Sequence, residues 1–247
     1  MKILFLDVET SPNIAHVWGL WQNNVSLNQL MESSHMLCWA AKWAGSKTTE
    51  FASIYNSDRV SMLKRIHELL DEADVVVHYN GKRFDMPTLN KEFLLAGYAP
   101  PSPYKQIDLF QTVKAKFRFP SNKLDYVSGE LGLGKKKQHE GHTLWVKCMA
   151  GEAKAWATMK AYNVQDVVLL EKLYKKLLPW IPNHPHRALF SDAHLEHSCP
   201  NCGSTHITKK GFSVTAAGRW QRYQCQGCGA WSKGEKILAL KDVLKQA

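Results

Sequence analysis

The chain has 247 residues, of which 45% are hydrophobic, and it carries a formal net charge of +10 with a pI of about 9.3. This length and composition permit one sizeable hydrophobic core with a small appended module. The sequence contains no run of about 18 apolar residues, which excludes a membrane-spanning helix. The charge favours a polyanionic partner but does not require one, because a soluble protein can also be basic without such a partner.

The N-terminal segment "MKILFLDVETS" has an apolar run that is too short for a signal peptide and is followed at once by acids. We therefore expect a cytoplasmic protein, of the kind that bacteria or phages encode, in which thiols stay reduced. Four of the six cysteines lie in two pairs near the C-terminus. The other two, Cys38 and Cys148, are most simply small buried apolar residues.

Hydrophobic periodicity predicts alternating strands and helices over the first 180 residues. Strands are expected at 2–8, 16–21, 36–44, 50–55 and 75–80. A helix is expected at 59–74, where apolar residues recur at helical spacing, and another at 86–98, which has Pro near its start and Gly near its end. A short helix is expected within 123–134, and the longest one at 152–178, which ends before Pro179. This alternation indicates an α/β domain.

Three groups of acidic residues stand in unusual contexts. Asp7 and Glu9 follow a predicted buried strand, and period-2 geometry places both carboxylates on the same side of the chain, where like charges are costly. Asp85 lies just past another apolar strand, at 75–80, and could simply cap a helix. Tyr162 and Asp166, four residues apart in the longest helix, share one face of it, although a helical Asp is usually just solvated. Each group alone is a weak signal.

Together and in this order, the three groups resemble the motifs of the DnaQ-like, or DEDD, 3′–5′ exonucleases. "DVE" at 7–9 matches the first motif, "NGKRFD" at 80–85 the second, and "YNVQD" at 162–166 the third in its tyrosine form. The segments "IDLFQTV" and "KLDYVSGELGLGKK" between the second and third motifs are also similar to the family. The resemblance covers roughly residues 1–180 and implies a ribonuclease H-like fold, with a mixed sheet flanked by helices.

The resemblance implies a site in which four carboxylates hold two divalent ions, Mg²⁺ or Mn²⁺. Phosphodiester cleavage needs a hydroxide nucleophile and neutralisation of charge on the attacking and leaving oxygens, and two ions about 3.5–4 Å apart supply both. On the family pattern, Asp7 would bridge both ions, and Glu9 and Asp166 would complete the ion that activates water. Asp85 would help to hold the second ion, and Tyr162 would orient the water. No motif acid is missing, which argues against an inactive descendant.

The resemblance also suggests residues that contact the substrate. Thr10 and Ser11 follow the first motif, where the family holds the terminal nucleotide. Asn80 and Phe84 would shape the site, with Phe84 near a base.

Four tryptophans lie in the long segment after the first motif: Trp18, Trp21, Trp39 and Trp43. Aromatic rings beside a metal site can stack on bases. Core positions are favoured for Trp39 and Trp43, whereas core and stacking roles both stay open for Trp18 and Trp21.

Basic residues gather between the second and third motifs, including Lys114, Lys116, Arg118, Lys123 and the run Lys135, Lys136 and Lys137. Such residues usually form a solvated face, but a predicted polyanion site nearby favours phosphate contacts. His139 and His142 are interpreted as loop residues rather than metal ligands, because no third ligand accompanies them.

The paired cysteines form the pattern Cys199-x₂-Cys202-x₂₂-Cys225-x₂-Cys228, and two such pairs close a tetrahedral Zn²⁺ site. Gly203 and Gly229 suit the tight turns after each pair. A β-hairpin is expected in the spacer, His197 and His206 are spare ligands, and a redox role is disfavoured because the two pairs match. The segment resembles a zinc ribbon of the kind found in some transposases.

The spacer between the cysteine pairs contains basic and aromatic residues but no acid: Lys209, Lys210, Arg219, Arg222, Phe212, Trp220 and Tyr223. A nucleic-acid contact, with Arg219 and Arg222 as candidates, is favoured over a purely structural ribbon. The expected organisation is a nuclease domain at 1–180, a linker at 181–194, a zinc ribbon at 195–233 and a C-terminal tail at 234–247 that forms at most a short amphipathic helix.

The sequence thus predicts a metal-dependent 3′–5′ exonuclease with two Mg²⁺ or Mn²⁺ ions and one structural Zn²⁺. DNA, most simply single-stranded, is favoured over RNA as the substrate, and a replication or repair protein is a possible partner. The alternatives are a structure-selective endonuclease or a ribonuclease on the same fold, and a non-catalytic nucleic-acid-binding protein.

Overall fold

The computed structural model describes residues 1–21, 23–190, 197–215 and 218–238. The chain divides into two compact units, Lys2–Leu173 and Tyr174–Ala247, with Met1 grouped with the second. No helix in the described part of the chain is both long enough and apolar enough to cross a membrane.

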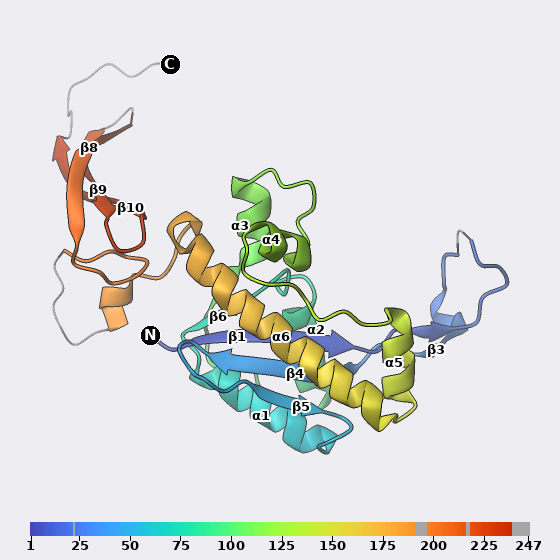
Figure 1. Cartoon of the computed structure of the whole chain (residues 1–247). Helices are drawn as coiled ribbons and strands as arrows, with labels where there is room; N and C mark the ends of the chain where they lie inside the picture. The colour runs from blue at the N-terminus through green and yellow to red at the C-terminus, as the bar shows by residue number, and fades with distance from the viewer. Residues whose placement is uncertain (22, 191–196, 216–217, 239–247) are drawn as a thin grey trace. The chain divides into compact units, whose positions relative to one another are not determined.

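The first unit is built on a five-stranded mixed sheet in the order β5-β4-β1-β6-β7 (Figure 1). The strands are β1 (Ile3–Thr10), β4 (Met36–Trp43), β5 (Glu50–Ser53), β6 (Val75–His78) and β7 (Lys105–Asp108). Strand β1 pairs antiparallel with β4 and parallel with β6, and β7 continues the parallel half of the sheet. This α/β architecture, with helices around a mixed sheet, confirms the predicted fold class.

Six helices accompany the sheet in the described residues: α1 (Arg59–Glu72), α2 (Asp85–Leu95), α3 (Leu109–Lys116), α4 (Leu124–Glu130), α5 (His142–Met149) and α6 (Ala153–Leu177). Asp58 starts α1 by accepting a hydrogen bond from the Ser61 amide, and Asp108 starts α3 in the same way from the Phe110 amide. Helix α6 runs across the sheet (Figure 1).

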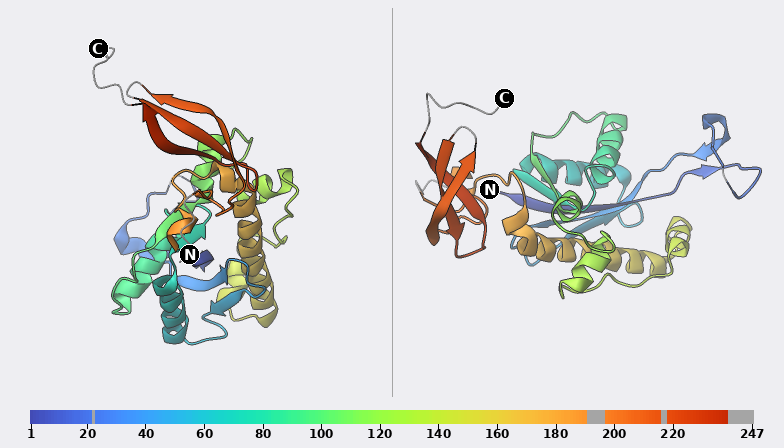
Figure 2. Two further views of the ribbon diagram at one scale, coloured as in Figure 1. Left: turned by 90° about the vertical axis from the view of Figure 1, so that its left-hand side faces the viewer. Right: turned by 90° about the horizontal axis from the view of Figure 1, so that it is seen from above.

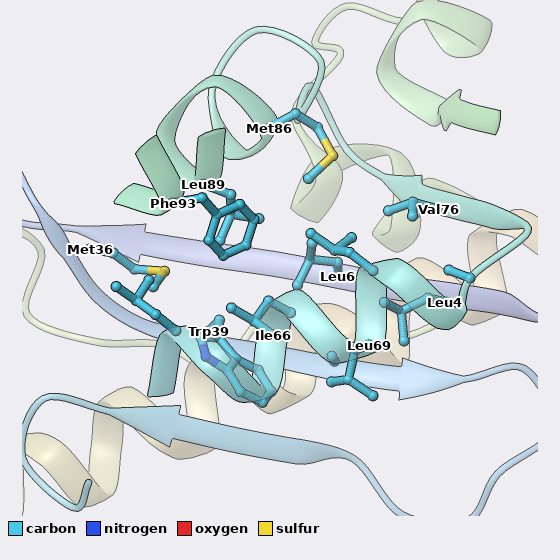
Figure 3. Close-up of a cluster of buried hydrophobic side chains, with 14 of the residues drawn as sticks. Leu4, Leu6, Met36, Trp39, Ile66, Leu69, Val76, Met86, Leu89 and Phe93 are labelled. Atoms are coloured by element: carbon cyan, nitrogen blue, oxygen red, sulfur yellow. The ribbon is translucent and has the colours of Figure 1, made fainter. Parts of the chain in front are cut away.

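The main core lies between the sheet and helices α1 and α2. Leu4 and Leu6 of β1 and Trp39 of β4 meet Ile66 of α1 and Phe93 of α2 there, and all are buried (Figure 3). A smaller core joins Leu37 and Cys38 of β4 to α5 and α6. Because successive side chains of a strand point to opposite faces, the even-numbered residues of β1 fill the first core and its odd-numbered residues face the other side.

Several predicted elements differ from the structure. The expected strand at 16–21 is wrong, because the described residues of that region form strands only at β2 (Ile14–Ala15) and β3 (Leu30–Glu32). Strand β7 and helices α3 and α5 were not predicted. Strand β7 is only four residues long and lies in a stretch rich in proline and lysine. Its apolar pattern is therefore too short to be recognised in the sequence.

Residues 11–21 and 23–35, which we call the arm, project from the sheet between β1 and β4 (Figure 2). Trp18 and Trp21 lie on the arm and are 102% and 88% exposed, which excludes the core role that the sequence left open for them. Trp39 is buried, and Trp43 is half-buried against the main core, as expected.

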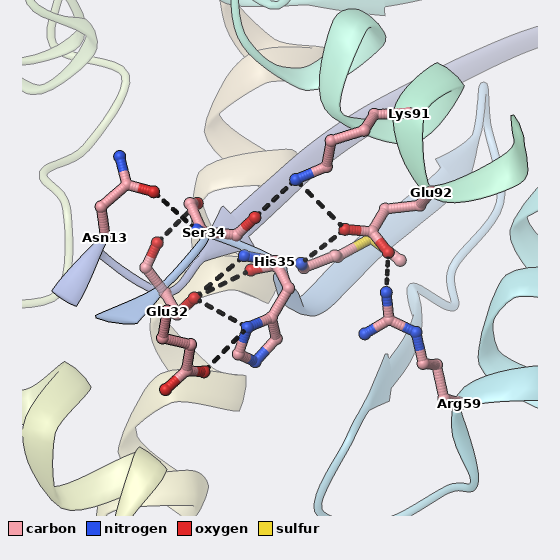
Figure 4. Close-up of polar contacts among 9 residues, drawn as sticks. Asn13, Glu32, Ser34, His35, Arg59, Lys91 and Glu92 are labelled. Carbon is pink, nitrogen blue, oxygen red and sulfur yellow. Dashed lines mark hydrogen bonds and ion pairs between the residues drawn. The ribbon is translucent and has the colours of Figure 1, made fainter. Parts of the chain in front are cut away.

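The base of the arm is fixed by a polar network (Figure 4). Asn13 accepts a hydrogen bond from the Ser34 amide at 2.7 Å, and Lys91 of α2 donates to the Ser34 carbonyl. Glu92, which is buried, accepts the Met36 amide at 3.3 Å and pairs with Arg59. These contacts tie the arm to helix α2 next to the point where β1 ends.

The second unit contains the short helices η2 (Leu178–Trp180) and η3 (Arg187–Phe190) and a three-stranded antiparallel sheet in the order β10-β9-β8. The strands are β8 (Ile207–Thr215), β9 (Gly218–Cys225) and β10 (Trp231–Leu238). Strands β8 and β9 form the hairpin expected between the cysteine pairs. The expectation of a helical tail is wrong for residues 234–238, which belong to β10, while 239–247 and linker residues 191–194 lie outside the described residues.

Candidate active site and metal centres

Strand β1 presents Asp7 and Glu9 on the face opposite to Leu4 and Leu6. The two acids lie inside the strand rather than after it, opposite Ala40 and Cys38 of β4. On the other edge, β6 pairs with β1 only as far as Phe5. Beyond Phe5 the parallel neighbour has ended, so the two carboxylates stand at the open end of the parallel half of the sheet.

The loop after β6 brings Asp85 to the same end. Asn80 has a φ of 65°, and its amide donates to Asp108 Oδ1 at 2.9 Å, which links the loop to the end of β7. A Cβ on Gly81 would lie 2.8 Å from Asp85 Oδ2 and 2.6 Å from His78 Cγ, so glycine is required there. Asp85 is buried at the start of α2, and its Oδ1 accepts the Val8 amide at 2.9 Å.

Helix α6 supplies Tyr162 and Asp166, both buried, from one face as the i, i+4 spacing predicted. Asn163 lies beside them and is fully buried. Its Nδ2 donates to Asp7 Oδ2 at 2.6 Å, which joins α6 to β1 across 156 residues of sequence. Sequence reasoning missed Asn163. The sequence feature that could have identified Asn163 is its position inside the third motif, next to Tyr162. That part of the helix must be buried if Asp166 is to reach the site.

The structure brings three of the four predicted acids into one cluster. Asp7, Glu9 and Asp166 each place a carboxylate oxygen within 4.8 Å of the others. Asp85 is not a member of this group, but it lies close enough for its charge to raise the pKa of Asp7. The four carboxylates therefore converge on one region from β1, the loop after β6, and α6.

This convergence makes ionisation costly in the absence of cations. Burial, followed by the charges of Glu9, Asp85 and Asp166, raises the pKa of Asp7 well above its usual range. Burial and the charge of Asp166 raise the pKa of Glu9 to about 8, and burial raises that of Asp85 to about 6. The pKa of Tyr162 is also raised, first by burial and then by Glu9 and Asp166, so its hydroxyl stays protonated at neutral pH.

Lys136 is the cation nearest to the acids. Its Nζ pairs with Asp166 Oδ2 and donates to Tyr162 Oη at 3.2 Å, while its backbone amide donates to Asp125 at 2.7 Å. Burial alone would lower the pKa of Lys136. The negative charges of Asp166, Asp7 and Glu9 outweigh burial and raise the pKa above its ordinary value, so the amine is charged. Of the predicted lysine run, Lys136 thus enters the site, whereas Lys135 and Lys137 are exposed.

An open cleft of about 530 Å³ adjoins the cluster. Asp7, Lys136 and Tyr162 line one part of it, and Tyr79, Asn80, Phe110 and His139 line others. His139 packs edge-on against Tyr162 with ring centroids 4.7 Å apart, and Trp145 of α5 packs on both rings. His139 therefore supports the tyrosine, a role that its loop position did not reveal, and His142 begins α5.

The other predicted substrate contacts, Phe84, Thr10, Ser11, Arg219 and Arg222, are not among the residues that line this cleft. Phe84 is 58% exposed, with the Arg83 guanidinium 5.6 Å from its ring centre. Thr10 is half-buried, and Ser11 is buried. The Ser11 hydroxyl lies 3.1 Å from His35 Nδ1 and accepts the His35 amide at 3.0 Å, so it holds the base of the arm. Arg219 and Arg222 lie on β9 of the second unit.

The four paired cysteines also come together. Their sulfurs all lie within 4.8 Å of one another, with Cys199 and Cys228 3.6 Å apart and Cys202 and Cys225 3.5 Å apart. Tetrahedral Zn²⁺ with Zn–S bonds of about 2.3 Å requires sulfurs about 3.8 Å apart. Burial raises the pKa of Cys225, but the amides of Cys228 and Gly227 and the Cys202 thiol outweigh it and bring the pKa to about 7. The donor set and spacing fit Zn²⁺. Cys38 and Cys148 lie buried in the smaller core, as expected.

Comparison with known proteins agrees with the fold. The family model of the RNase H superfamily matches residues 4–178, which is most of the chain. The chain belongs to the RNase H superfamily. No curated protein sequence matches it.

The RNase H superfamily domain has a structural counterpart in the family B DNA polymerase of the hyperthermophilic archaeon Pyrobaculum calidifontis. The TM-score is 0.56 at 19% sequence identity, and the match covers 72% of this chain and 24% of the polymerase. The chain therefore spans about a quarter of that protein, and at this identity the likeness concerns the fold.

The acidic cluster of this RNase H superfamily domain suits hard divalent cations. Its ligands are carboxylate oxygens, which Mg²⁺ and Mn²⁺ prefer. Asp166 Oδ1 is buried without a hydrogen-bond partner among the described residues, while Oδ2 pairs with Lys136. An orphaned oxygen that faces two further raised-pKa carboxylates is the arrangement expected of a site that is completed by a cation.

Proposed function

We propose that the chain is a metal-dependent 3′–5′ exonuclease of the DnaQ-like, DEDD type, in its tyrosine form. The observation that carries the proposal is the clustering of Asp7, Glu9 and Asp166 within 4.8 Å beside Tyr162, with Asp85 at the same end of the sheet. Membership of the RNase H superfamily supports a nuclease, and the oxygen-only ligand set supports a phosphoryl-transfer chemistry that depends on divalent cations.

Asp7, Glu9 and Asp166 would hold one Mg²⁺ or Mn²⁺ ion, and Asp85 with Asp7 would hold a second. The ions would supply charge neutralisation on the phosphate oxygens and a water of lowered pKa. Tyr162 would orient that water through its protonated hydroxyl, and Asn163 would keep Asp7 in place through its 2.6 Å hydrogen bond. Lys136 already contacts Asp166 and Tyr162, so its amine stands where a phosphate group would enter.

The proposed substrate is DNA, most simply a single strand that enters the cleft with its 3′ end. Asn80 and the exposed ring of Phe84 would contact the terminal nucleotides, with Thr10, Lys135 and Lys137 nearby on the same unit. The second unit, with one Zn²⁺ on its four cysteines, would form a zinc ribbon that increases affinity for nucleic acid. The ribbon is basic, because residues 197–234 include no Asp or Glu.

The direct test uses single-stranded DNA labelled at either end, incubated with Mg²⁺ or Mn²⁺. A 3′–5′ exonuclease shortens the 5′-labelled strand in a ladder and releases single nucleotides from a 3′-labelled strand. Asp7→Asn and Asp166→Asn should lower the rate by at least about 1,000-fold. Gln165→Ala, which alters a half-buried amide on the same helix, should stay within about twofold of the native rate.

Other outcomes would redirect the proposal. Cleavage of circular single-stranded DNA would identify an endonuclease, and faster cleavage of RNA of the same sequence would identify a ribonuclease. Full activity in the Asp7→Asn and Asp166→Asn variants would contradict the proposed site. Binding without cleavage under all metal conditions would leave a non-catalytic nucleic-acid-binding protein.

A further inference from the structure

The three-stranded sheet of the second unit has two chemically different faces. In β9, period-2 alternation places Trp220, Arg222 and Gln224 on one face and Arg219, Gln221 and Tyr223 on the other. Strand β10 adds Lys233, which lies opposite Arg222 in the register, and Trp231, which lies opposite Gln224. We call the face formed by Trp220, Arg222, Trp231 and Lys233 the tryptophan face.

Cations and indole rings alternate on the tryptophan face. The Arg222 guanidinium lies 4.7 Å from the Trp231 ring centre, and Lys233 Nζ lies 5.1 Å from that of Trp220. Arg222 Nε also donates to the Lys210 carbonyl at 3.0 Å. Lys210 Nζ donates to Gln224 Oε1 at 2.7 Å, which places a third cation on the same face. Arg222 is therefore held in one orientation before any ligand binds.

Acids are scarce in the sequence that forms this face. Residues 197–234 contain no Asp or Glu, and the first acid after them is Glu235. Trp231 is 50% exposed, so about half of a large apolar ring faces water. Trp220 is half-buried. Partly exposed indole rings beside several cations are suited to a ligand that has both flat apolar surfaces and negative charges.

The opposite face is a weaker match for such a ligand. In its described part it has one pair of a cation and a ring, with the Arg219 guanidinium 4.3 Å from the ring centre of Phe212, which is 42% exposed, and an exposed Val214. Its largest ring, that of Tyr223, is covered by β10, because a Cβ on Gly234 would lie 2.6 Å from the ring. Arg219 and Arg222, the two arginines that the sequence singles out, point to opposite faces of the sheet, and only Arg222 lies on the tryptophan face.

We propose that the tryptophan face binds a single strand of nucleic acid, with bases stacked on Trp220 and Trp231 and phosphates at Lys210, Arg222 and Lys233. The inference rests on the proposed function for the identity of the polyanion. An unpaired strand exposes the faces of its bases to aromatic rings, whereas a duplex buries them in its own stack. The face therefore favours single strands over duplexes.

The test measures binding by the full-length, zinc-loaded chain to a fluorescent single-stranded oligonucleotide, by anisotropy, with no Mg²⁺ or Mn²⁺ added. Trp231→Ala should raise the Kd by about 5- to 100-fold, the range expected for loss of a stacked base. Trp231→Phe keeps a ring and should stay within about threefold. Arg222→Gln should weaken binding and make it less sensitive to salt.

The matched controls are Phe212→Ala and Arg219→Gln, which remove the corresponding ring and cation from the opposite face and should change the Kd by less than twofold. Zinc content, measured for each variant, identifies any variant that has lost the fold. If Trp231→Ala has lost zinc, the affinity of Trp231→Phe, which keeps an aromatic ring, is used to test the inference instead. Equal weakening by the control pair, or native affinity in Trp231→Ala and Arg222→Gln, would overturn the inference. So would duplex binding as tight as single-strand binding.

Cleavage assays separate this inference from the proposed nuclease. A chain that cleaves DNA normally but binds it independently of the tryptophan face would refute the inference and leave the nuclease proposal intact. If the chain never cleaves DNA but Trp231→Ala weakens its binding, the nuclease proposal is refuted and the inference about the tryptophan face is supported.

Discussion

At the scale of single residues, the acids of the site have a chemical reason for their position that packing alone does not supply. Asp7, Glu9 and Asp166 crowd together although each raises the pKa of a neighbour. Asn163 holds Asp7, and Lys136 offsets part of the charge at Asp166. Such repulsion costs stability in the free protein, and a bound cation would remove the cost.

The raised pKa of Glu9 predicts a pH dependence of stability. Between its ordinary value of 4.5 and about 8, the unfolded chain has released this proton while the folded chain retains it. The folded state is then the one that binds more protons, so the free energy of unfolding falls as pH rises through that window. Because the side chain is half-buried, solvent screening limits the loss to about 1–2 kcal/mol, or roughly 3–6 °C in Tm.

Thermal melts from pH 5 to 8.5, without added divalent ions, measure this fall. Glu9→Gln should reduce it, and Mg²⁺ or Mn²⁺ should reverse it in the native protein, because the ion stabilises the ionised form. Glu130→Gln, which changes an exposed acid on α4, should leave the slope as it is. The predicted coupling would be contradicted if Tm fell equally with pH in the native and Glu9→Gln proteins, or if Mg²⁺ and Mn²⁺ left the Tm of the native protein unchanged.

At the scale of elements, the site depends on how strand ends and one helix meet. Strand β6 stops pairing with β1 at Phe5, which opens the space that the loop from Asn80 to Asp85 enters. Helix α6 crosses the same end of the sheet, and its bond from Asn163 to Asp7 fixes the helix against β1. A small shift of any of these elements separates the carboxylates.

Gly81→Ala tests the fit of that loop. The added methyl group would collide with Asp85 Oδ2 and the His78 ring, so we expect a loss of about 1–3 kcal/mol in unfolding free energy. Displacement of Asp85 should also lower nuclease activity by at least tenfold. Gly129→Ala on α4, where nothing lies within 4 Å, is the matched control and should be neutral or stabilising. Native stability and activity in Gly81→Ala would contradict this prediction, because the loop would then accommodate the methyl group without displacing Asp85.

At the scale of the whole molecule, the two units have very different means of stabilisation. The first unit has an extended core between its sheet and helices α1 and α2. Among the described residues of the second unit, the cluster around the cysteines has three buried members, Cys199, Cys225 and Ala230, with Cys202, Ile207 and Cys228 partly buried against them. A cluster of that size is expected to need a metal or another cross-link to fold, and the four cysteines are the residues that could bind one.

Metal analysis of the purified chain should therefore find one zinc per molecule. Cys202→Ser should abolish zinc binding and make residues after 197 sensitive to protease, while the first unit keeps its own core and its cleavage of short oligonucleotides. Cys148→Ala, which alters a buried thiol of the smaller core, should retain zinc. Zinc retained in Cys202→Ser, or a ribbon that resists protease without zinc, would contradict a structural Zn(Cys)₄ site.

The sequence by itself singled out the residues of the candidate site and of the cysteine pairs, because their types and spacing are local. It predicted the fold class, most of the strands and helices of the first unit, the order of Asp7, Asp85 and Asp166, and the two cysteine pairs. Its periodicity failed where an element is very short, as in β7, or where apolar residues face water, as Trp18 and Trp21 do on the arm.

Only the tertiary structure decided which residues meet. It joined Asn163 to Asp7 and placed Lys136 rather than Lys135 among the acids. Periodicity reports how each segment is buried, but contacts between segments depend on strand register and helix packing. The local pattern could name the ligands of the site, and the packing of distant segments determined their supporting residues.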